Sequence, residues 1–140
     1  MSNTWLSNED YDFVFNLVPR LCVDLIIRKE GGIILSFRDI EPNKDFWHMP
    51  GGMVYKNESI ENAAKRIAKK ESGLDLSIMK LIGFIEFPHE MQAGKDRHTV
   101  SIVLEVKAIG GEAKTDFQSK KINVFTDLPN NMHPVQENFL

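Results

Sequence analysis

Short apolar runs separated by turn residues dominate this chain and predict a protein rich in strands. Glu30-Gly31-Gly32 separates the first two runs and predicts a tight turn between paired strands. Gly110-Gly111 follows the fourth run and predicts another turn. The predicted strands are Leu21–Ile27, Ile33–Phe37, Leu81–Phe87, Val100–Val106 and Ile122–Phe125.

Two segments show helical features instead. The stronger lies between Ser59, a suitable N-cap, and Gly73, a suitable C′ residue. A shorter helix is predicted over residues 8–17, where Glu9 and Asp10 lie at the positive end of the helix dipole. In the stronger helix, apolar residues spaced by three and four form one stripe that would be buried: Ile60, Ala63, Ala64, Ile67 and Ala68.

Glu71 falls where that apolar stripe would continue, four residues after Ile67 and three after Ala68. Burying a carboxylate without a partner costs several kcal/mol, so an inward-pointing Glu71 should be paired or bound to a metal ion. The alternative is a glutamate at the helix end that reaches solvent. The position marks Glu71 as a candidate functional residue.

Length and composition indicate one ordinary globular domain spanning residues 1–140. The net charge of −3 argues against a broad nucleic-acid-binding face. No apolar run reaches the ~18 residues that a membrane helix needs, and the N-terminus lacks a signal-peptide pattern. The single cysteine, Cys22, lies in an apolar run and is interpreted as a small buried residue. We therefore expect a cytoplasmic protein.

The segment 52–74 carries the most specific motif in the chain. After Gly52 come Glu58, six residues on, Arg66, eight further, and then Glu71-Ser72-Gly73-Leu74. Trp47-His48-Met49-Pro50-Gly51-Gly52 leads directly into it. This pattern resembles the Nudix box, GX5EX7REUXEEXGU with U an aliphatic residue. The resemblance implies an α/β Nudix fold, with a mixed sheet sandwiched between helices, and hydrolysis of a nucleoside diphosphate linked to another group.

Two box glutamates are replaced, by Ile67 and Lys70. These losses argue against a cluster of several metal ions and favour one Mg²⁺, with Mn²⁺ as an alternative. Mg²⁺ suits the chemistry because it uses few protein ligands and neutralises charge on the departing diphosphate. Glycine in the Pro50–Gly52 turn would let backbone carbonyls approach the cation closely.

The same losses resemble the GDP-mannose mannosyl hydrolase branch of the family, and this resemblance covers nearly the whole chain. In that branch water attacks the anomeric carbon of the sugar, so that GDP leaves intact. The matching segments are Asn8–Tyr11, Leu21–Ile26, Arg38 before Trp47–Gly52, and His133 with Phe139.

This resemblance implies a role for each matching residue. The metal would be held by the Gly52 carbonyl, Glu71 and Gln118, and Glu58 and Arg66 would form a structural pair. Arg38 would bind the leaving diphosphate, since its guanidinium can contact phosphate through two hydrogen bonds; the alternative is a solvated charge at a strand end. Asp24 would lie near the sugar or orient Arg38; the alternative is a structural ion pair. Tyr11 would stack on guanine; the alternative is packing in the core.

The family's general base, a histidine after the metal-binding glutamine, is replaced by Ser119. Met53 and Thr99 stand where the family has an arginine and a tyrosine that assist the leaving group. Other proton acceptors are therefore considered. These are His48 beside the Pro-Gly-Gly turn, His89 and His98 around the polar stretch 90–97, interpreted as a loop, and more weakly Glu86, Glu90 and Glu112.

The sequence thus predicts a Mg²⁺-dependent hydrolase of a nucleotide sugar of the GDP-mannose type. Two alternatives stay open: a Nudix pyrophosphatase in which water attacks phosphorus, and a nucleotide-sugar-binding protein that has lost turnover. Related enzymes pair through their N-terminal segments, which predicts a homodimer with residues 1–18 in the contact.

Overall fold

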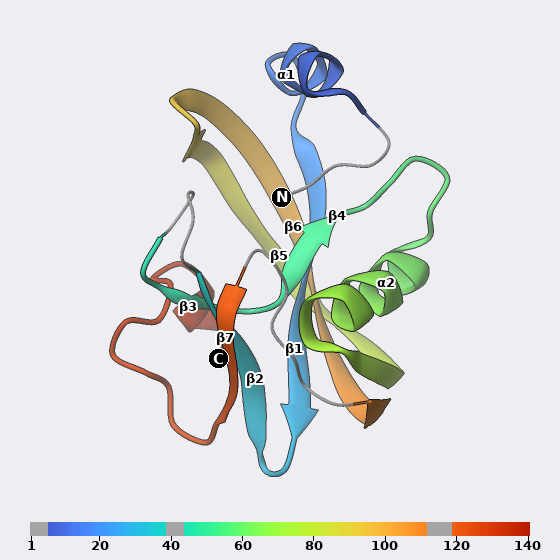
Figure 1. Cartoon of the computed structure of the whole chain (residues 1–140), viewed down its shortest axis with the longest axis vertical. Helices are drawn as coiled ribbons and strands as arrows, with labels where there is room; N and C mark the ends of the chain where they lie inside the picture. Colours follow the sequence, from blue (N-terminus) through green and yellow to red (C-terminus); the bar gives the residue numbers. More distant parts are fainter. Residues whose placement is uncertain (1–5, 39–43, 112–118) are drawn as a thin grey trace.

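The computed structural model describes residues 6–38, 44–111 and 119–140, and for residues 78, 79 and 119–121 it describes the backbone alone. The elements are α1 (Asn8–Phe15), β1 (Arg20–Lys29), β2 (Gly32–Arg38), β3 (Trp47–His48), β4 (Gly51–Met53), α2 (Ile60–Ser72), β5 (Leu74–Gln92), β6 (Lys95–Gly111), β7 (Ser119–Phe125) and the 3-10 helix η1 (Gln136–Phe139). The strands of these described residues form one sheet of order β3-β2-β1-β6-β5, with β4 paired to β1 and β7 to β2 (Figure 1). β1 runs parallel to β6 and the other pairs are antiparallel, which confirms the predicted mixed sheet.

All the predicted strands are confirmed, and two of them are much longer than predicted. The polar stretch 90–97 is not a loop, because β5 and β6 continue through it as a hairpin that turns at Ala93-Gly94. The turn predicted at Gly110-Gly111 is also wrong, since both glycines pair with β5 at the end of β6. A Cβ on Gly111 would lie 2.2 Å from the Gly73 carbonyl oxygen, so glycine here permits a close backbone approach.

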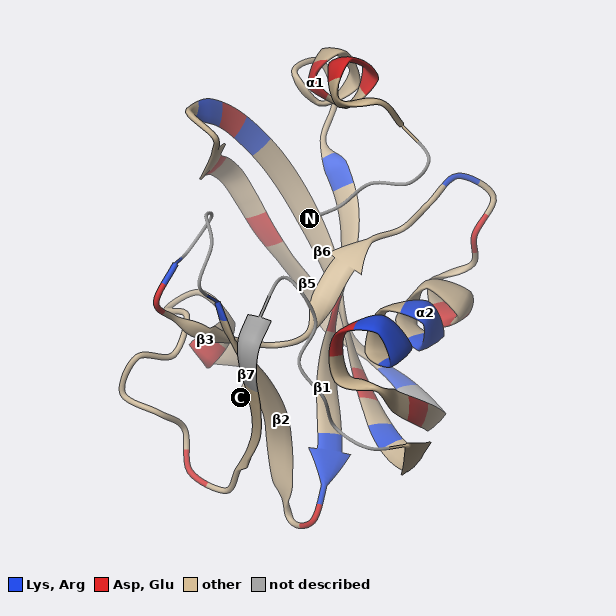
Figure 2. Ribbon diagram, in the orientation of Figure 1, with Lys and Arg blue, Asp and Glu red and all other residues tan. Residues whose placement is uncertain are grey.

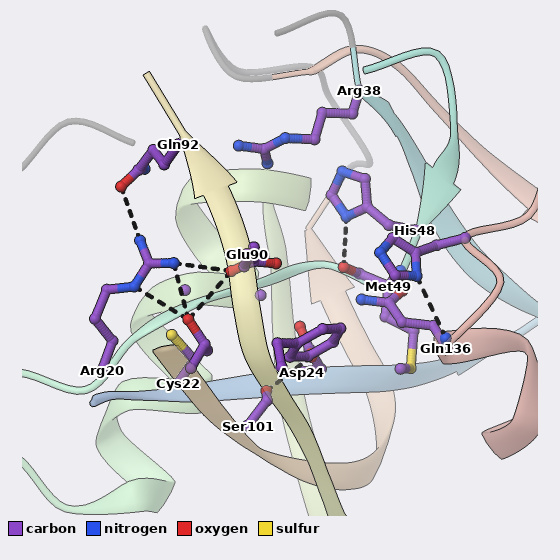
Figure 3. Close-up of a pocket in the computed structure, with 15 residues that line it drawn as sticks. Arg20, Cys22, Asp24, Arg38, His48, Met49, Glu90, Gln92, Ser101 and Gln136 are labelled. Atoms are coloured by element: carbon purple, nitrogen blue, oxygen red, sulfur yellow. Dashed lines mark hydrogen bonds and ion pairs between the residues drawn. The ribbon is translucent and has the colours of Figure 1, made fainter. Parts of the chain in front are cut away.

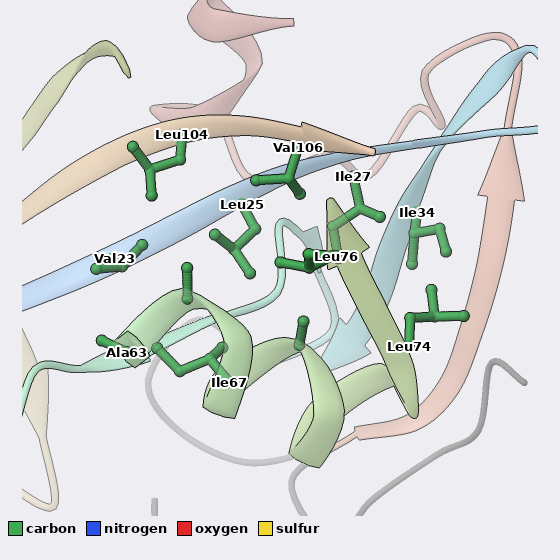
Figure 4. Packing of buried hydrophobic residues seen from close by; sticks show 12 residues of the cluster. Val23, Leu25, Ile27, Ile34, Ala63, Ile67, Leu74, Leu76, Leu104 and Val106 are labelled. Carbon is green, nitrogen blue, oxygen red and sulfur yellow. The ribbon is translucent and has the colours of Figure 1, made fainter. Parts of the chain in front are cut away.

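Helix α2 follows the predicted pattern at both ends. The Ser59 side chain accepts a hydrogen bond from the Asn62 backbone, and Gly73 closes the helix in the left-handed conformation with φ of 76°. The apolar stripe of α2 packs on β1, β5 and β6, as Figure 4 shows for Ile67 and its neighbours. This cluster covers one face of the sheet; on β1 it includes Val23, Leu25 and Ile27.

A second apolar cluster covers the opposite face of the sheet. Ile26, one residue away from Leu25 on β1, belongs to it, because successive strand residues point to opposite faces. The covering element is the C-terminal segment, which contributes Met132, Phe139 and Leu140. A backbone bridge between Trp47 and Met132 holds this segment beside β3.

Helix α1 lies at one end of the molecule, beyond the turn of the β5–β6 hairpin (Figure 1). It buries none of its residues fully and is held by ion pairs. Arg97 and Lys95 contact the Asp12 carboxylate, and Arg97 also donates to Asn16 at 2.9 Å. Figure 2 shows these acidic and basic groups at the same end of the fold. No helix within the described ranges 6–38, 44–111 and 119–140 is long and apolar enough to cross a membrane.

Candidate active site

A pocket opens on the face of the sheet that carries the C-terminal segment. Asp24 lies on this face, since it alternates along β1 with Val23 and Leu25, which point toward α2. β4 and β3 supply the rim on one side. The wall includes Arg20, Cys22 and Asp24 of β1, Phe87, Glu90 and Gln92 of β5, Thr99 and Ser101 of β6, and Arg38, His48, Gly51, Gly52, His133 and Gln136 (Figure 3).

Asp24 is the buried acid of this pocket. It is 9% exposed, and one carboxylate oxygen accepts a hydrogen bond from Ser101 Oγ at 2.7 Å. Burial raises the pKa of Asp24 to about 7, although the Ser101 hydrogen bond lowers it. The other oxygen lies so near Gly51 that a Cβ there would be 2.1 Å away, so only glycine fits at position 51. The hydrogen-bond partner that the structure shows for the Asp24 carboxylate is thus the Ser101 hydroxyl.

Arg20 organises one end of the pocket wall and was not identified from the sequence. Its Nε and Nη2 donate to Thr99, and Nη2 also donates to Glu90 at 2.8 Å. Its Nη1 donates to Tyr11 at 2.7 Å and to Gln92 at 3.0 Å. These contacts use all five guanidinium N–H donors. Arg20 is therefore committed to protein groups, and Arg38 is the other arginine on the described pocket wall.

Tyr11 lies behind this network rather than on the pocket wall. Its hydroxyl accepts from Arg20 and donates to Gln92 at 3.2 Å, and its ring meets Phe15 edge to face. The structure therefore links Tyr11 to the pocket through Arg20 and Gln92. A stacking role with a base remains a prediction.

Two histidines complete the opposite side of the pocket. His48 is 7% exposed, and its Nδ1 lies 2.7 Å from the Met49 carbonyl oxygen. Burial lowers the pKa of His48 to about 4, which keeps the ring neutral at pH 7. His133 is also buried, and burial lowers its pKa. Gln136 fixes the neighbouring backbone by accepting a hydrogen bond from the Met49 N–H at 2.6 Å.

The other candidate proton acceptors lie in different places. His89 is exposed and pairs with Asp96 at 2.9 Å, and neither His89 nor His98 belongs to the pocket wall. Glu86 is exposed, whereas Glu90 lines the pocket but is paired with Arg20. Glu112 lies outside the described residues.

The candidate metal ligands among the described residues come from β4, which carries Gly52, and from α2, which carries Glu71. Gly52 lines the pocket, and Glu71 is buried on α2, 4% exposed, which excludes the alternative of a solvent-facing glutamate. Gln118 lies outside the described residues, and for Ser119 only the backbone is described. Within the described part of the chain, no three or more His, Cys, Asp or Glu side chains group as a metal cage. A carboxylate and a carbonyl oxygen are the kind of sparse, hard donor set that Mg²⁺ uses, so these residues fit that ion.

Glu58 and Arg66 join the loop after β4 to helix α2. Arg66 Nε and Nη2 donate to the two Glu58 oxygens at 2.8 and 2.9 Å, and Nη2 also donates to the Met53 carbonyl at 2.6 Å. The guanidinium carbon of Arg66 lies 3.9 Å from the centre of the Tyr55 ring. Since Met53 directly follows Gly52, this pair holds the candidate carbonyl ligand against α2.

Sequence reasoning placed Asp24, Arg38 and Gly52 on one site, and the structure brings them to one pocket. It missed Arg20, Gln92 and Ser101. Polar residues at 99 and 101 alternate with apolar residues at 100 and 102, and that period of two marks a polar stripe on β6.

Cys22 is half-buried on the pocket wall rather than in the core, and burial raises its pKa to about 12.

Comparison with known proteins identifies the family. A family model of the NUDIX domain matches residues 18–138. The low-salt glycan biosynthesis protein Agl8 of Haloferax volcanii is 31% identical over 140 residues, covering 98% of this chain and 90% of that protein. An ADP-ribose pyrophosphatase of Methanocaldococcus jannaschii is 37% identical over 114 residues, covering 81% of this chain and 65% of that protein.

Solved structures agree with the family match. The MutT NUDIX hydrolase from Burkholderia pseudomallei superposes with a TM-score of 0.77 at 25% identity, over 87% of this chain and 95% of that one. The MutT protein from Methanosarcina mazei superposes with a TM-score of 0.71 at 20% identity, over 88% and 91% of the two chains, which shows the shared fold. The chain belongs to the Nudix family and is a Nudix hydrolase.

Proposed function

We propose that this Nudix hydrolase cleaves a nucleoside diphosphate sugar of the GDP-mannose type with Mg²⁺ or Mn²⁺ as cofactor. The observation that carries the proposal is the distribution of charge on the pocket wall. Arg20 donates its N–H groups to protein atoms, whereas Arg38 lines the pocket wall at the position where the family resemblance places the leaving diphosphate. The rest of the wall offers the carboxyl groups of Asp24 and Glu90, together with hydroxyls, amides and neutral imidazoles, which suit a polyhydroxyl group better than further phosphates.

Each candidate residue then has a role in one reaction. Arg38 binds the diphosphate that departs, and Asp24, held by Ser101, faces the sugar near the anomeric carbon. A bound Mg²⁺, held by the Gly52 carbonyl, Glu71 and Gln118, would neutralise charge developing on the leaving group. Water attacks the anomeric carbon, the bond from that carbon to the diphosphate oxygen breaks, and GDP, free sugar and one proton of the attacking water are released.

A second candidate function is attack of water on phosphorus. The similarity to an ADP-ribose pyrophosphatase favours this alternative, whereas the similarity to a glycan biosynthesis protein supports a nucleotide sugar. Hydrolysis in ¹⁸O-labelled water with Mg²⁺ separates the two reactions. We expect the label in the free sugar from GDP-mannose. Label in a phosphate product would support phosphorus attack, and binding without products would support a nucleotide-sugar-binding protein.

We also propose that the protein is a cytoplasmic homodimer with the N-terminal segment in the contact. Two apolar residues at this end of the chain are strongly exposed, Phe13 at 67% and Leu17 at 69%. Exposed large apolar side chains at one end of a molecule are the kind of residue that a protein contact covers. Sedimentation equilibrium is expected to give a dimer, and the double substitution Phe13→Ser with Leu17→Ser is expected to give a monomer.

A further inference from the structure

His48 and His133 line the same pocket with opposite hydrogen-bonding character. His48 Nδ1 faces the Met49 carbonyl oxygen at 2.7 Å, and a carbonyl can only accept a hydrogen bond. Nδ1 must therefore carry the ring proton, which leaves Nε2 of the neutral ring as an acceptor. This Nε2 has no hydrogen-bond partner among the described residues, although the side chain is more than nine-tenths buried.

His133 has the other tautomer. Its Nδ1 accepts a hydrogen bond from the Val135 backbone N–H at 3.2 Å, and a second N–H, from Gln136, lies 3.5 Å away. A backbone N–H can only donate, so Nδ1 carries the lone pair and Nε2 carries the proton. The two rings are near enough for a charge on His133 to lower the pKa of His48. The pocket wall thus carries, on neutral side chains, one fixed acceptor, which is itself a buried atom, and one fixed donor.

A hydroxyl group is the ligand group that fits this pair. Each hydroxyl both donates and accepts, whereas a phosphate oxygen only accepts and would meet the lone pair of His48 Nε2. We propose that His48 and His133 bind hydroxyls of the sugar moiety and so select a nucleoside diphosphate sugar over the bare diphosphate. This inference rests on the proposed function for the identity of the ligand. It makes both histidines specificity-determining residues and gives neither the role of general base.

Ser36 offers a competing explanation for His48. It lies directly opposite His48 in the β2–β3 pair, and its Oγ is another buried atom without a partner among the described residues. A Ser36 hydroxyl turned toward Nε2 would satisfy the histidine without a ligand. ¹⁵N-detected histidine NMR of the ligand-free protein tests this point. We expect His48 as the Nδ1–H tautomer, His133 as the Nε2–H tautomer, and an unchanged His48 Nε2 signal in Ser36→Ala. Reversed tautomers, or a His48 signal that moves in Ser36→Ala, would overturn the inference.

Asparagine substitutions separate the ligand-facing nitrogen from the structural hydrogen bond. The Asn amide in His48→Asn can still donate to Met49 O, and the Asn oxygen in His133→Asn can still accept from Val135 N–H, but neither reaches as far as Nε2. Glutamine instead places an amide near the Nε2 position and is expected to restore part of the affinity. His89→Asn is the matched control, because His89 is exposed and lies outside the pocket wall.

The affinities are measured by calorimetry for GDP-mannose against GDP and for ADP-ribose against ADP, with Ca²⁺ replacing Mg²⁺ and ligand integrity checked afterwards. The preference for at least one sugar-bearing ligand over its diphosphate is expected to fall about tenfold in each pocket Asn variant and to stay unchanged in His89→Asn. A wild-type protein without such a preference, or Asn variants that keep it, would overturn the inference. Product release with Mg²⁺ is assayed separately: binding through these histidines without turnover supports the inference and contradicts the proposed hydrolysis.

Discussion

Asp24 makes the folded protein less stable as the pH rises. The pKa of its carboxyl is about 7 in the folded state against 3.8 for an ordinary aspartate, so the folded chain holds a proton that the unfolded chain loses between these values. Stability therefore falls as the pH rises from about 4 to about 7, by at most about 4 kcal/mol. A buried acid that costs stability is typical of a functional site.

The substitution Asp24→Asn tests this cost. Asn keeps an acceptor for Ser101 but removes the ionisation, so we expect it to stabilise the fold at pH 8 much more than at pH 5, while lowering hydrolysis. Urea unfolding of both proteins at the two pH values measures the difference. Equal changes in stability at pH 5 and pH 8 would show that Asp24 is ionised in the fold at both.

Gly51 packs so closely against Asp24 that a side chain at position 51 would clash with it. An added Cβ would meet the Asp24 carboxylate at 2.1 Å and the rigid Val23 carbonyl at 2.8 Å. We expect Gly51→Ala to destabilise the protein by about 1–3 kcal/mol and to displace β4 with its Gly52 carbonyl. Thermal unfolding checks the stability. Gly110→Ala is the control, since its Cβ would come no closer than 3.5 Å to Asp75, an ordinary contact; a similar loss in both variants would contradict a specific clash.

At the scale of elements, helix α2, which carries the Nudix box and is called the box helix below, could be predicted from the sequence. The hydrogen-bond network around Arg20 on the pocket wall could not. The stripe from Ile60 to Ala68, the Ser59 cap and Gly73 are local signals within 59–73, and the structure confirms each. The extension of β5 and β6 was missed because residues 90–97 are polar and resemble a loop. The Arg20 contacts join residues 70 or more positions apart, except for Tyr11, and no local pattern specifies such pairs.

The Glu58–Arg66 pair braces the element that carries Gly52. Both side chains are partly buried and joined by two hydrogen bonds, and the hydrogen bond from Arg66 lowers the pKa of the Glu58 carboxyl. A double-mutant cycle with Glu58→Gln and Arg66→Gln is expected to give a coupling of about 1–2 kcal/mol. The control cycle on the exposed Glu61–Lys65 pair of the same helix is expected to give less than about 0.5 kcal/mol. Equal coupling energies in the two cycles would mean that the Glu58–Arg66 pair contributes no more to stability than an exposed surface ion pair.

At the scale of the whole molecule, the fold places the box helix and the pocket on opposite faces of one sheet, with β4 between them. Glu71 belongs to the α2 side and Asp24 to the pocket side, while Gly51 and Gly52 pair with β1 at the junction. A metal ion held by the Gly52 carbonyl and Glu71 would therefore link two elements that otherwise meet through packing and the Arg66 brace. Metal binding should then stabilise the whole domain, because an ion that binds only the folded state shifts the unfolding equilibrium.

Thermal unfolding with increasing Mg²⁺ measures that link without requiring a substrate. At one hundred times the dissociation constant, the ion is expected to add about 2.7 kcal/mol, which raises the Tm of a domain of this size by several degrees. In Glu71→Gln the Mg²⁺-dependent rise should be lost, because the amide removes the anionic ligand, and hydrolysis should be lost with it. In the control Glu137→Gln, which changes an exposed glutamate of η1, the Mg²⁺-dependent rise in Tm should be retained. An undiminished Mg²⁺ response in Glu71→Gln would remove Glu71 from the metal site, and the buried carboxylate would then need a structural role within α2.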